Sequence, residues 1–393
     1  MKWKNRGHEY DEVFHNLDRR TKIFLFGAGE RGIKVFDIIN LWLPGEFEIK
    51  GFVDNNVSKQ HTRLEGLDIL SVDEMAEHTD EKTAIVICIY GASPIRGIDL
   101  QLQEYGYIKN KDYFHYTEFF SVYFAYKKNK LFFPDVSFLP LTNCNLRCEA
   151  CLNFTPYIKK FESRNINKLK EEIDVFFEAV DLIDLFHVSG GEPQLYKELP
   201  ELLKYISEKY GDRIHTLGTV TNGTIIPSEE FLKIYHDYPI MVTVDDYREA
   251  IPGISDKFDS VVRRLENVHG KGRYEVLKYD AWIDVMPKGR TLPELNDKQL
   301  EKKYDECHVL LQEYRDGKMF TCNYGSYASV AGLTGDIPES DYYDLRTYDR
   351  SKLKELMEFR MGYSINGYSD FCRKCAGLFD VNAVRVKPGK QVK

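Results

Sequence analysis

The chain has 393 residues, and its 43% hydrophobic and 13% aromatic content is enough for two or three packed domains. A formal net charge of −8 argues against a broad nucleic-acid surface, which would need clustered lysine and arginine. No apolar run approaches the length of a membrane span, and the charged segment 1–14 lacks the apolar stretch of a secretory signal. We therefore expect a cytoplasmic protein with no membrane span and no nucleic-acid partner, in which the eight cysteines are metal ligands or free thiols.

Residues 21–125 alternate between strand-like and helix-like segments. Strands are expected at 22–26, 47–53 and 84–90, and helices at 33–39 and 99–105. The run 84–90 is apolar throughout, which is typical of a strand buried in a parallel sheet. This alternation predicts an α/β fold that begins with a Rossmann-like parallel sheet.

A glycine-rich turn follows the first of these strands. Gly27, Gly29 and Gly32 form a GxGxxG pattern, and Asp54 ends the second strand. The glycines permit a tight turn in which a phosphate approaches the N-terminus of a helix, and the carboxylate is placed to accept hydrogen bonds from a ribose. These four residues are therefore candidate nucleotide ligands. The alternative is a domain that has kept the fold and lost the ligand.

Two short motifs in this segment resemble those of the truncated Rossmann-like domains of surface-polysaccharide enzymes. They are Gly51-Phe-Val-Asp-Asn55 and Gly66-Leu-Asp-Ile-Leu70. In that family such domains handle nucleotide-linked sugars or serve as scaffolds. The resemblance implies that nucleotide sugars are one class of ligand to expect for this part of the chain.

A charged, proline-containing connector at 126–138 leads into a second run of alternating elements. Strands are expected at 136–140, 185–189, 215–221, 240–245 and 279–285, and helices at 166–179, 199–210 and 229–236. Because strands that alternate with helices form parallel sheets, this segment predicts a second parallel sheet.

Three cysteines follow the first of these strands in a CxxxCxxC pattern, Cys144, Cys148 and Cys151. Soft thiolates select iron–sulfur clusters or zinc over hard cations. A closed zinc site needs a fourth ligand nearby, and the next cysteine in the sequence is the distant Cys307. The spacing therefore favours a [4Fe–4S] cluster with three protein ligands and one open iron, with a zinc loop or chance spacing as the alternatives.

The motif Ser189-Gly-Gly-Glu-Pro193 follows the cysteine loop, and Thr221-Asn-Gly223 follows a later strand. Together with the cysteine spacing, these motifs resemble the radical S-adenosylmethionine (SAM) superfamily. The resemblance implies a partial TIM barrel, (β/α)6, with its site at the C-terminal ends of the strands. It also implies that the open iron chelates SAM and that an electron from a flavodoxin- or ferredoxin-type donor cleaves it. The resulting 5′-deoxyadenosyl radical then abstracts hydrogen from a substrate.

The same resemblance assigns SAM-binding residues to this chain. Gly190, Gly191 and Glu192 match the motif for the methionine end of SAM. Asn222 is placed to contact the ribose or the methionine end. Asp245 ends the next strand, at a position where many relatives carry a residue that touches the sugar of SAM.

Four later cysteines form a second candidate metal site. Cys307 and Cys322 flank a segment in which Asp316-Gly317 predicts a hairpin turn, and Cys372 and Cys375 follow as a CxxC pair. The pattern resembles a twitch domain, the shorter form of the SPASM domain. This resemblance implies an auxiliary [4Fe–4S] cluster with four protein ligands, although four thiolates would also hold zinc.

Other residues near these motifs have structural interpretations. Ala150 stands where many relatives carry an aromatic residue against the adenine, so we expect adenine contacts to come from elsewhere. Core packing is the expected role of Phe154 and Tyr157, with lining of the cavity as the alternative. His187 is expected to be a core histidine, and Cys88 to pack as a small hydrophobe in its strand. The sequence identifies no catalytic acid or base.

These expectations define three domains: a Rossmann-like domain at 1–128, a radical SAM partial barrel at 129–298 and a small α+β twitch-like domain at 299–393. We expect an enzyme that uses SAM and two [4Fe–4S] clusters to abstract hydrogen from a small molecule. A nucleotide-activated sugar in glycan or natural-product biosynthesis fits the first domain, and the outcome would be oxidation, epimerisation or dehydration. The alternatives are a peptide-modifying enzyme of the same superfamily and a non-catalytic iron–sulfur or nucleotide-binding scaffold.

Overall fold

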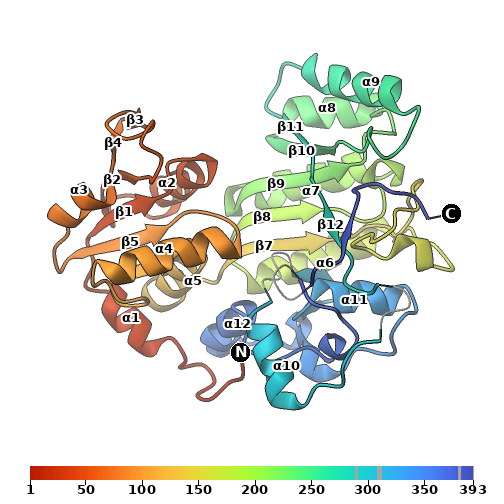
Figure 1. Cartoon of the computed structure of the whole chain (residues 1–393). Helices are drawn as coiled ribbons and strands as arrows, with labels where there is room; N and C mark the ends of the chain where they lie inside the picture. The colour runs from red at the N-terminus through yellow and green to blue at the C-terminus, as the bar shows by residue number, and fades with distance from the viewer. Residues whose placement is uncertain (288–290, 308–311, 379–381, 393) are drawn as a thin grey trace. The chain divides into compact units, whose positions relative to one another are not determined.

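The computed structural model describes residues 1–287, 291–307, 312–378 and 382–392, which fold into two compact units (Figure 1). The first unit contains residues 5–132 and 353–361. The second contains residues 1–4, 133–352 and 362–393. Within the described part of the chain, no helix is both long enough and apolar enough to cross a membrane.

The first unit is built on a six-stranded sheet in the order β3-β4-β2-β1-β5-β6. All of its pairs are parallel except β3 with β4, so the predicted N-terminal parallel sheet is confirmed. Its strands are β1 (Lys22–Phe26), β2 (Glu48–Val53), β3 (Arg63–Leu64), β4 (Leu67–Leu70), β5 (Thr83–Ile87) and β6 (Tyr113–His115). Its helices are α1 (Asp11–Leu17), α2 (Glu30–Trp42), α3 (Val72–Glu77), α4 (Ala92–Glu104), α5 (Tyr116–Lys127) and α12 (Leu353–Arg360).

Helix α12 reaches this unit from the far end of the sequence. The Glu358 carboxylate accepts hydrogen bonds from the backbone N–H groups of Gly7, at 2.7 Å, and Glu9, at 2.8 Å. Glu355 forms an ion pair with Arg6 at 2.5 Å. A helix from the segment predicted as the third domain therefore packs in the first unit, although the three predicted boundaries themselves stay predictions.

The second unit is built on an eight-stranded sheet in the order β11-β10-β9-β8-β7-β13-β14-β15. Its strands are β7 (Phe132–Phe138), β8 (Leu182–Val188), β9 (Ile214–Thr221), β10 (Ile240–Asp245), β11 (Arg273–Leu277), β13 (Glu313–Arg315), β14 (Lys318–Phe320) and β15 (Tyr342–Asp344). Its helices are α6 (Ile166–Ala179), α7 (Leu199–Tyr210), α8 (Glu229–Asp237), α9 (Ser255–Glu266), α10 (Asp297–Asp305) and α11 (Asn323–Val330). The strands from β8 to β11 pair in parallel, and one of the helices α6 to α9 lies between each strand and the next from β7 onward. This mostly parallel sheet is consistent with a partial barrel (Figure 1).

The central elements were largely predictable, with one exception. Helices α6 and α7 and strand β10 have the predicted bounds. The strand predicted at 279–285 is wrong, because only β12 (Trp282–Ile283) is extended there, and it pairs outside the main sheet with β16 (Arg385–Val386). The strand beside β10 is instead β11. Its five residues are exposed or half-buried, so its sequence lacks the apolar pattern of a buried strand.

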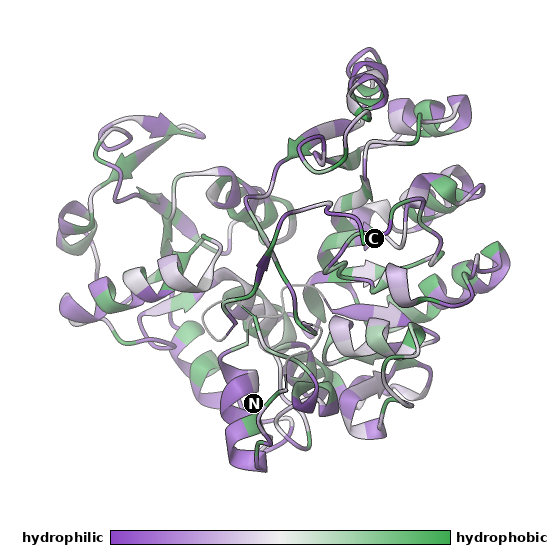
Figure 2. Ribbon diagram, turned by 45° about the vertical axis from the view of Figure 1, so that its right-hand side comes forward, coloured by the Kyte–Doolittle hydropathy of each residue, from purple (hydrophilic) through white to green (hydrophobic). Residues whose placement is uncertain are grey.

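The core of this unit lies between the sheet and helix α6. Asn165 caps the helix, because its side-chain oxygen accepts hydrogen bonds from the N–H groups of residues 167 and 168. Phe176 of α6 packs edge-to-face on Phe186 of β8, with ring centroids 5.5 Å apart, and meets Tyr314 of β13 at 5.2 Å. Figure 2 shows hydrophilic and hydrophobic segments alternating along the helices, as expected for helices that bury one face.

The predicted hairpin is confirmed between β13 and β14, which pair antiparallel around Asp316-Gly317. Both turn residues have positive φ, 52° at Asp316 and 75° at Gly317, as a two-residue hairpin turn requires. Strand β13 also pairs in parallel with β7. The hairpin therefore extends the central sheet beyond the strand that leads into the cysteine loop.

The glycine-rich turn of the first unit depends on close backbone packing at one of its glycines. A Cβ atom added to Gly32 would lie 2.0 Å from the carbonyl oxygen of Gly27. A Cβ added to Gly29 would have no described atom within 4 Å. The turn therefore tolerates a side chain at Gly29 and excludes one at Gly32.

We expect the substitution Gly32→Ala to lower the free energy of unfolding of this unit by about 1–3 kcal/mol, because the backbone must shift to admit the methyl group. The matched control is Gly29→Ser, which places a favourable N-cap residue in open space at the start of α2. Denaturant unfolding followed by hydrogen exchange of the β1 amides measures both. Equal stability of the two variants would contradict the packing argument.

Candidate functional site

The cysteine loop connects the end of β7 to helix α6. Cys144, Cys148 and Cys151 gather around Leu146 and Tyr247 in one apolar cluster. The N–H group of Leu146 donates to Cys144 Sγ at 3.4 Å. Burial, with a smaller contribution from the neighbouring thiolates, raises the pKa of Cys144 and of Cys148 to about 12. Thiols in such a place become thiolates only when a cation binds them, which is the behaviour of metal ligands.

The Ser189–Pro193 turn packs directly against the start of this loop. A Cβ atom on Gly191 would lie 2.0 Å from the carbonyl oxygen of Asn143, and one on Gly190 would lie 2.5 Å from that of Leu141. Glu192 N–H donates to the Asn143 carbonyl at 2.7 Å. The two glycines are therefore required by contact between the turn and the loop backbone.

Glu192 and Asn222 connect this turn to the end of β9. The Glu192 carboxylate is buried and accepts hydrogen bonds from the N–H groups of Asn222, at 2.8 Å, and Gln194, at 3.1 Å. Burial raises the pKa of Glu192 to about 7, against the effect of these two bonds. The Asn222 side chain donates to Asn145 Oδ1 at 3.0 Å and lies 3.9 Å from Cys144 Sγ. The structure thus brings Glu192, Asn222 and the first cysteine together.

Asp245 lies at the end of β10 beside the same cluster. Its Oδ2 atom accepts a hydrogen bond from the Tyr247 hydroxyl at 2.6 Å, and its buried Oδ1 atom accepts none from the residues that the structure describes. Burial raises the pKa of Asp245 to about 6. The adjacent Asp246 is bound by the Arg248 guanidinium at 2.8 and 2.9 Å. Of the two aspartates, Asp245 therefore keeps an acceptor for a ligand.

The C-terminal segment lies against the cysteine loop, which sequence reasoning missed. Gln391 donates from Nε2 to Cys148 Sγ at 3.2 Å and accepts at Oε1 from the N–H of Arg147 at 2.7 Å. Lys390 pairs with Glu149 at 2.7 Å. No motif in the sequence signals this contact, because a single strand-like bridge between residues 148 and 391 has no local pattern.

The four later cysteines also converge. Burial is the larger cause of the raised pKa values of Cys307, Cys322 and Cys372, and nearby thiolates of the same group, which includes that of Cys375, raise them as well. Cys322 stands at the N-terminus of α11, where the helix dipole favours a negative charge. The Lys303 ammonium donates to the carbonyl oxygen of Cys372 at 2.7 Å and to that of Cys375.

Phe154 lies between the two groups of cysteines. It is buried in a cluster that also contains Cys322 and Cys375, and its ring meets that of Phe371 at 6.4 Å. Tyr157 packs against the same cluster. Both aromatic residues therefore contribute to the core of the second unit.

The remaining residues of interest lie on strands or at turns. Burial lowers the pKa of His187 to about 4, and its register partner on β9 is Gly218. Cys88 is buried after β5 and donates to the Val86 carbonyl at 3.2 Å. Ala150 has a positive φ of 58°, a conformation that an aromatic side chain would adopt only with strain.

In the first unit, the candidate nucleotide residues meet at the ends of β1 and β2. Asp54 accepts hydrogen bonds from Ala28 N–H and from the Lys59 ammonium, both at 3.0 Å. Burial acts to raise the pKa of Asp54, but the bonds from Asn56 N–H, Lys59 and Ala28 N–H outweigh it and lower the pKa. A ribose would therefore have to share this carboxylate with Lys59.

The side chains gathered at the cysteine loop suit the iron–sulfur cluster and the SAM that the motifs imply. Three thiols for a cluster stand beside two buried acceptors, Asp245 Oδ1 and Asn143 Oδ1, which accept no hydrogen bond within the described ranges. Both acceptors suit the hydroxyl and ammonium groups of a ligand. The arrangement can therefore hold an iron–sulfur cluster with a polar organic ligand beside it.

Comparison with known proteins gives a family match over the central segment, and it gives relatives that align with this chain over part of their length. GTP 3′,8-cyclase 1 of Mycobacterium tuberculosis is 25% identical over 146 residues, which are 35% of this chain and 40% of that protein. GTP 3′,8-cyclase 3 of Mycobacterium bovis is 26% identical over 258 residues, 61% of this chain and 66% of that protein. A crystal structure of BtrN in complex with AdoMet and 2-DOIA covers 63% of this chain and 95% of that one, with 16% identity and a TM-score of 0.39. The chain thus spans 40% of the length of the first relative.

The family match covers the cysteine loop and the elements around it. Residues 138–278 match the radical SAM superfamily. This range contains Cys144, Cys148 and Cys151, the Ser189–Pro193 turn, Asn222 and Asp245. The central segment of the chain therefore matches the radical SAM superfamily of enzymes.

Proposed function

We propose that this protein abstracts a hydrogen atom from a small molecule, using SAM and a [4Fe–4S] cluster held by Cys144, Cys148 and Cys151. When bound, the cluster and SAM supply a 5′-deoxyadenosyl radical for this step. The observation that carries the proposal is the meeting of three clustered thiols with the unfilled acceptor of Asp245 at the ends of parallel strands. Such strand ends are where barrels of this kind place their chemistry.

The residues of the chain would divide the binding of SAM between them. The Glu192 carboxylate, fixed by two backbone N–H groups, is placed with Gly190 and Gly191 to serve the methionine end. Asp245 Oδ1 would accept a hydrogen bond from a ribose hydroxyl. Tyr247 holds the other oxygen of that carboxylate and so fixes its orientation.

The four later cysteines would hold an auxiliary [4Fe–4S] cluster. Within the described ranges, no three His, Cys, Asp or Glu side chains are close enough together to hold a single metal ion. A cube of four irons spaces its thiolates more widely than a single zinc ion, whose sulfur ligands all lie about 2.3 Å from the metal. The resemblance of the pattern formed by Cys307, Cys322, Cys372 and Cys375 to a twitch domain is what favours a cluster over zinc.

We propose a sugar, free or nucleotide-activated, as the substrate class, with oxidation, epimerisation or dehydration as the outcome. Two observations support a nucleotide. The relatives at 25% and 26% identity are named for a reaction of GTP. In the first unit, Gly29 is the N-cap residue of helix α2, and a Cβ atom added to it would meet no described atom within 4 Å. An anion could therefore approach the N-terminus of this helix, which favours negative charge. A flavodoxin- or ferredoxin-type protein would supply the electron.

The first test is cleavage of SAM by the protein reconstituted with iron and sulfide without oxygen. We expect 5′-deoxyadenosine by mass spectrometry, and a loss of roughly a hundredfold or more in Cys148→Ala, because the loop then lacks a cluster ligand. Cys88→Ala is the matched control, since that thiol lies in the first unit, and it should retain the activity. A loop that binds zinc in place of iron would contradict the proposal.

The second test concerns the auxiliary site. We expect Cys375→Ala to lose about half of the bound iron and sulfide, because only one of the two clusters is affected. The electron paramagnetic resonance signal of the loop cluster, and its change on addition of SAM, should remain. Unchanged iron content would show that Cys375 is not a cluster ligand.

The third test concerns Gln391. Hydrogen bonds to cluster sulfurs stabilise the electron-rich reduced state, so Gln391→Leu should lower the reduction potential of the loop cluster. A difference of about 1 kcal/mol between the two oxidation states corresponds to roughly 40 mV for one electron. Potentiometric titration followed by electron paramagnetic resonance measures the shift.

Lys390→Ala is the control for this third test. Lys390 belongs to the same segment and pairs with Glu149, but its side chain bonds to the loop without touching sulfur. The potential should therefore stay unchanged. Equal shifts in both variants would mean that the segment acts by covering the loop and not through the hydrogen bond.

A further inference from the structure

Strand β13 presents two charged side chains to one face of the central sheet. Tyr314, in the middle of the strand, packs against Phe138 and Phe176 on the α6 side. Because side chains alternate along a strand, Glu313 and Arg315 lie on the opposite face. Glu313 is in register with Ser137 of β7, so it lies directly beside the strand that leads into the cysteine loop.

A pocket opens on this face of the sheet. It spans about 380 Å³ when the open solvent at its mouth is included, and its enclosed part has room for about one water molecule or one hydroxyl group. Its lining contains Glu313, Arg315 and Tyr327 from the twitch-like segment, and Asn153 and Gly191 from the SAM-binding side. The pocket therefore lies next to the turn proposed to hold the methionine end of SAM.

Glu313 is a buried carboxylate whose capacity to accept hydrogen bonds is incompletely used. Its exposure is 0%, and neither of its oxygens accepts a hydrogen bond from any residue in the described parts of the chain. Arg315 Nε is 3.6 Å from Glu313 Oε1, which is too long for a hydrogen bond. Burial raises the pKa of Glu313, while Arg315 and the Ser326 hydroxyl act in the opposite direction. A buried carboxylate without hydrogen bonds lowers the stability of the fold. A ligand that donates hydrogen bonds to it would restore the lost free energy.

The guanidinium of Arg315 also has a hydrogen-bond donor that is not used. One of its terminal nitrogens donates to Ser326 Oγ at 2.8 Å. Its buried Nε atom makes no hydrogen bond with the residues that the structure describes. A hydroxyl group placed between the two side chains could donate to Glu313 and accept from Arg315 at the same time.

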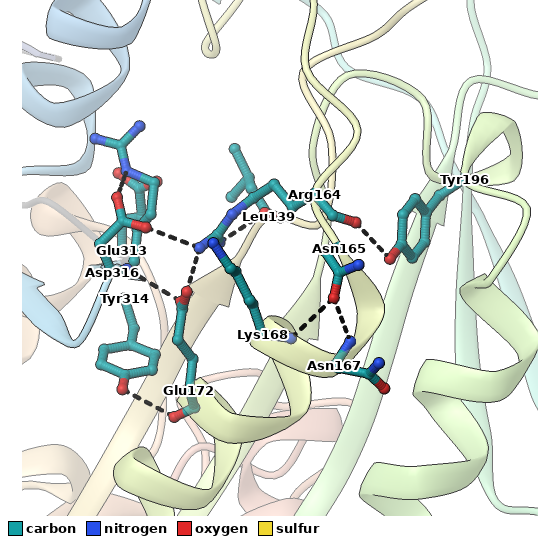
Figure 3. Close-up of polar contacts among 11 residues, drawn as sticks. Leu139, Arg164, Asn165, Asn167, Lys168, Glu172, Tyr196, Glu313, Tyr314 and Asp316 are labelled. Atoms are coloured by element: carbon teal, nitrogen blue, oxygen red, sulfur yellow. Dashed lines mark hydrogen bonds and ion pairs between the residues drawn. The ribbon is translucent and has the colours of Figure 1, made fainter.

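The turn at the end of this strand is bonded to helix α6 and to Arg164, which also lines the pocket. Figure 3 shows Arg164 between Glu172 of α6 and Asp316 of the hairpin turn, with Arg164 to Asp316 at 2.9 Å. Asp316 N–H donates to Glu172 at 3.0 Å, and the Tyr314 hydroxyl donates to the Glu172 carbonyl at 2.8 Å. The hairpin is thus fixed to α6, so Glu313 and Arg315 are oriented before any ligand arrives.

We propose that Glu313 and Arg315 bind hydroxyl groups of the substrate, as a donor–acceptor pair suited to a polyhydroxylated ring. This inference rests on the proposed function and narrows its substrate to a class that carries hydroxyl groups beside the reacting carbon. A purely structural ion pair would instead hold Glu313 and Arg315 together for stability alone.

The first experiment separates these roles without a ligand. In the substrate-binding role, Glu313→Gln removes a buried charge that lacks hydrogen bonds, so the melting temperature of the reconstituted holoenzyme should stay unchanged or rise by about 2–4 °C. In the structural role, the same change breaks a buried pair and lowers the melting temperature by several degrees. A clear drop would overturn the proposal.

The second experiment uses UDP-glucose and GDP-mannose as probes. We expect Glu313→Gln to weaken binding of the accepted probe to the SAM-loaded holoenzyme by about 10-fold to 100-fold, since a hydrogen bond to a charged group is lost. Cleavage of SAM without substrate should be unchanged, because Glu313 is not among the residues proposed to hold the cluster or SAM. Asp344→Asn, on β15 of the same sheet and paired with Arg346, is the control and should bind the probe as the unmodified protein does.

The outcomes distinguish this inference from the proposed function. The hydroxyl assignment would be overturned if Glu313→Gln bound the probe as tightly as the wild type does. It would also be overturned if the protein cleaved SAM but bound neither probe. Both results would leave the proposed function in place. A reconstituted protein that cannot cleave SAM would overturn the proposed function itself.

Discussion

The site depends on one close backbone contact, between the Ser189–Pro193 turn and the first residues of the cysteine loop. Only residues without a Cβ atom can occupy Gly190 and Gly191, since a methyl group on Gly191 would lie 2.0 Å from the Asn143 carbonyl. This contact holds the loop over the ends of β7 and β8. Glu192 then extends it to β9, because its carboxylate binds the N–H of Asn222. Three separate segments are thereby joined before any cofactor is present.

The buried carboxylates of the second unit fall into two kinds. Glu192 is bound by backbone N–H groups, so its charge is used to join elements of the fold. Asp245 has one oxygen without a hydrogen bond, and Glu313 has two, within the part of the chain that the structure describes. Because an unsatisfied buried acceptor is costly, the second kind marks places where a ligand would complete the hydrogen bonding. These places lie next to the cysteine loop and next to the Gly191 turn.

The sequence predicted the elements with strong local patterns and missed those with long-range partners. Helix α6 and strand β10 have the predicted bounds because their apolar periodicity decides their structure. Strand β11 was missed because an exposed edge strand carries little apolar pattern. The candidate cysteines followed from spacing alone, but the contact of Gln391 with Cys148 joins residues 243 positions apart. The buried Glu313 was also missed, since a glutamate before a hairpin turn is usually a solvated residue.

Phe154 links the cysteine loop to the hydrophobic cluster that surrounds the later cysteines. Phe154 follows Cys151 by three residues and is held at a positive φ of 51°, a costly conformation for an aromatic residue. The position is kept because the ring packs against Phe371, the residue before Cys372. A shift in the ligands of one site must therefore move the ring that supports the other. This coupling explains why the aromatic residues Phe154 and Tyr157 follow the third cysteine, since packing and not binding decides the residues at these two positions.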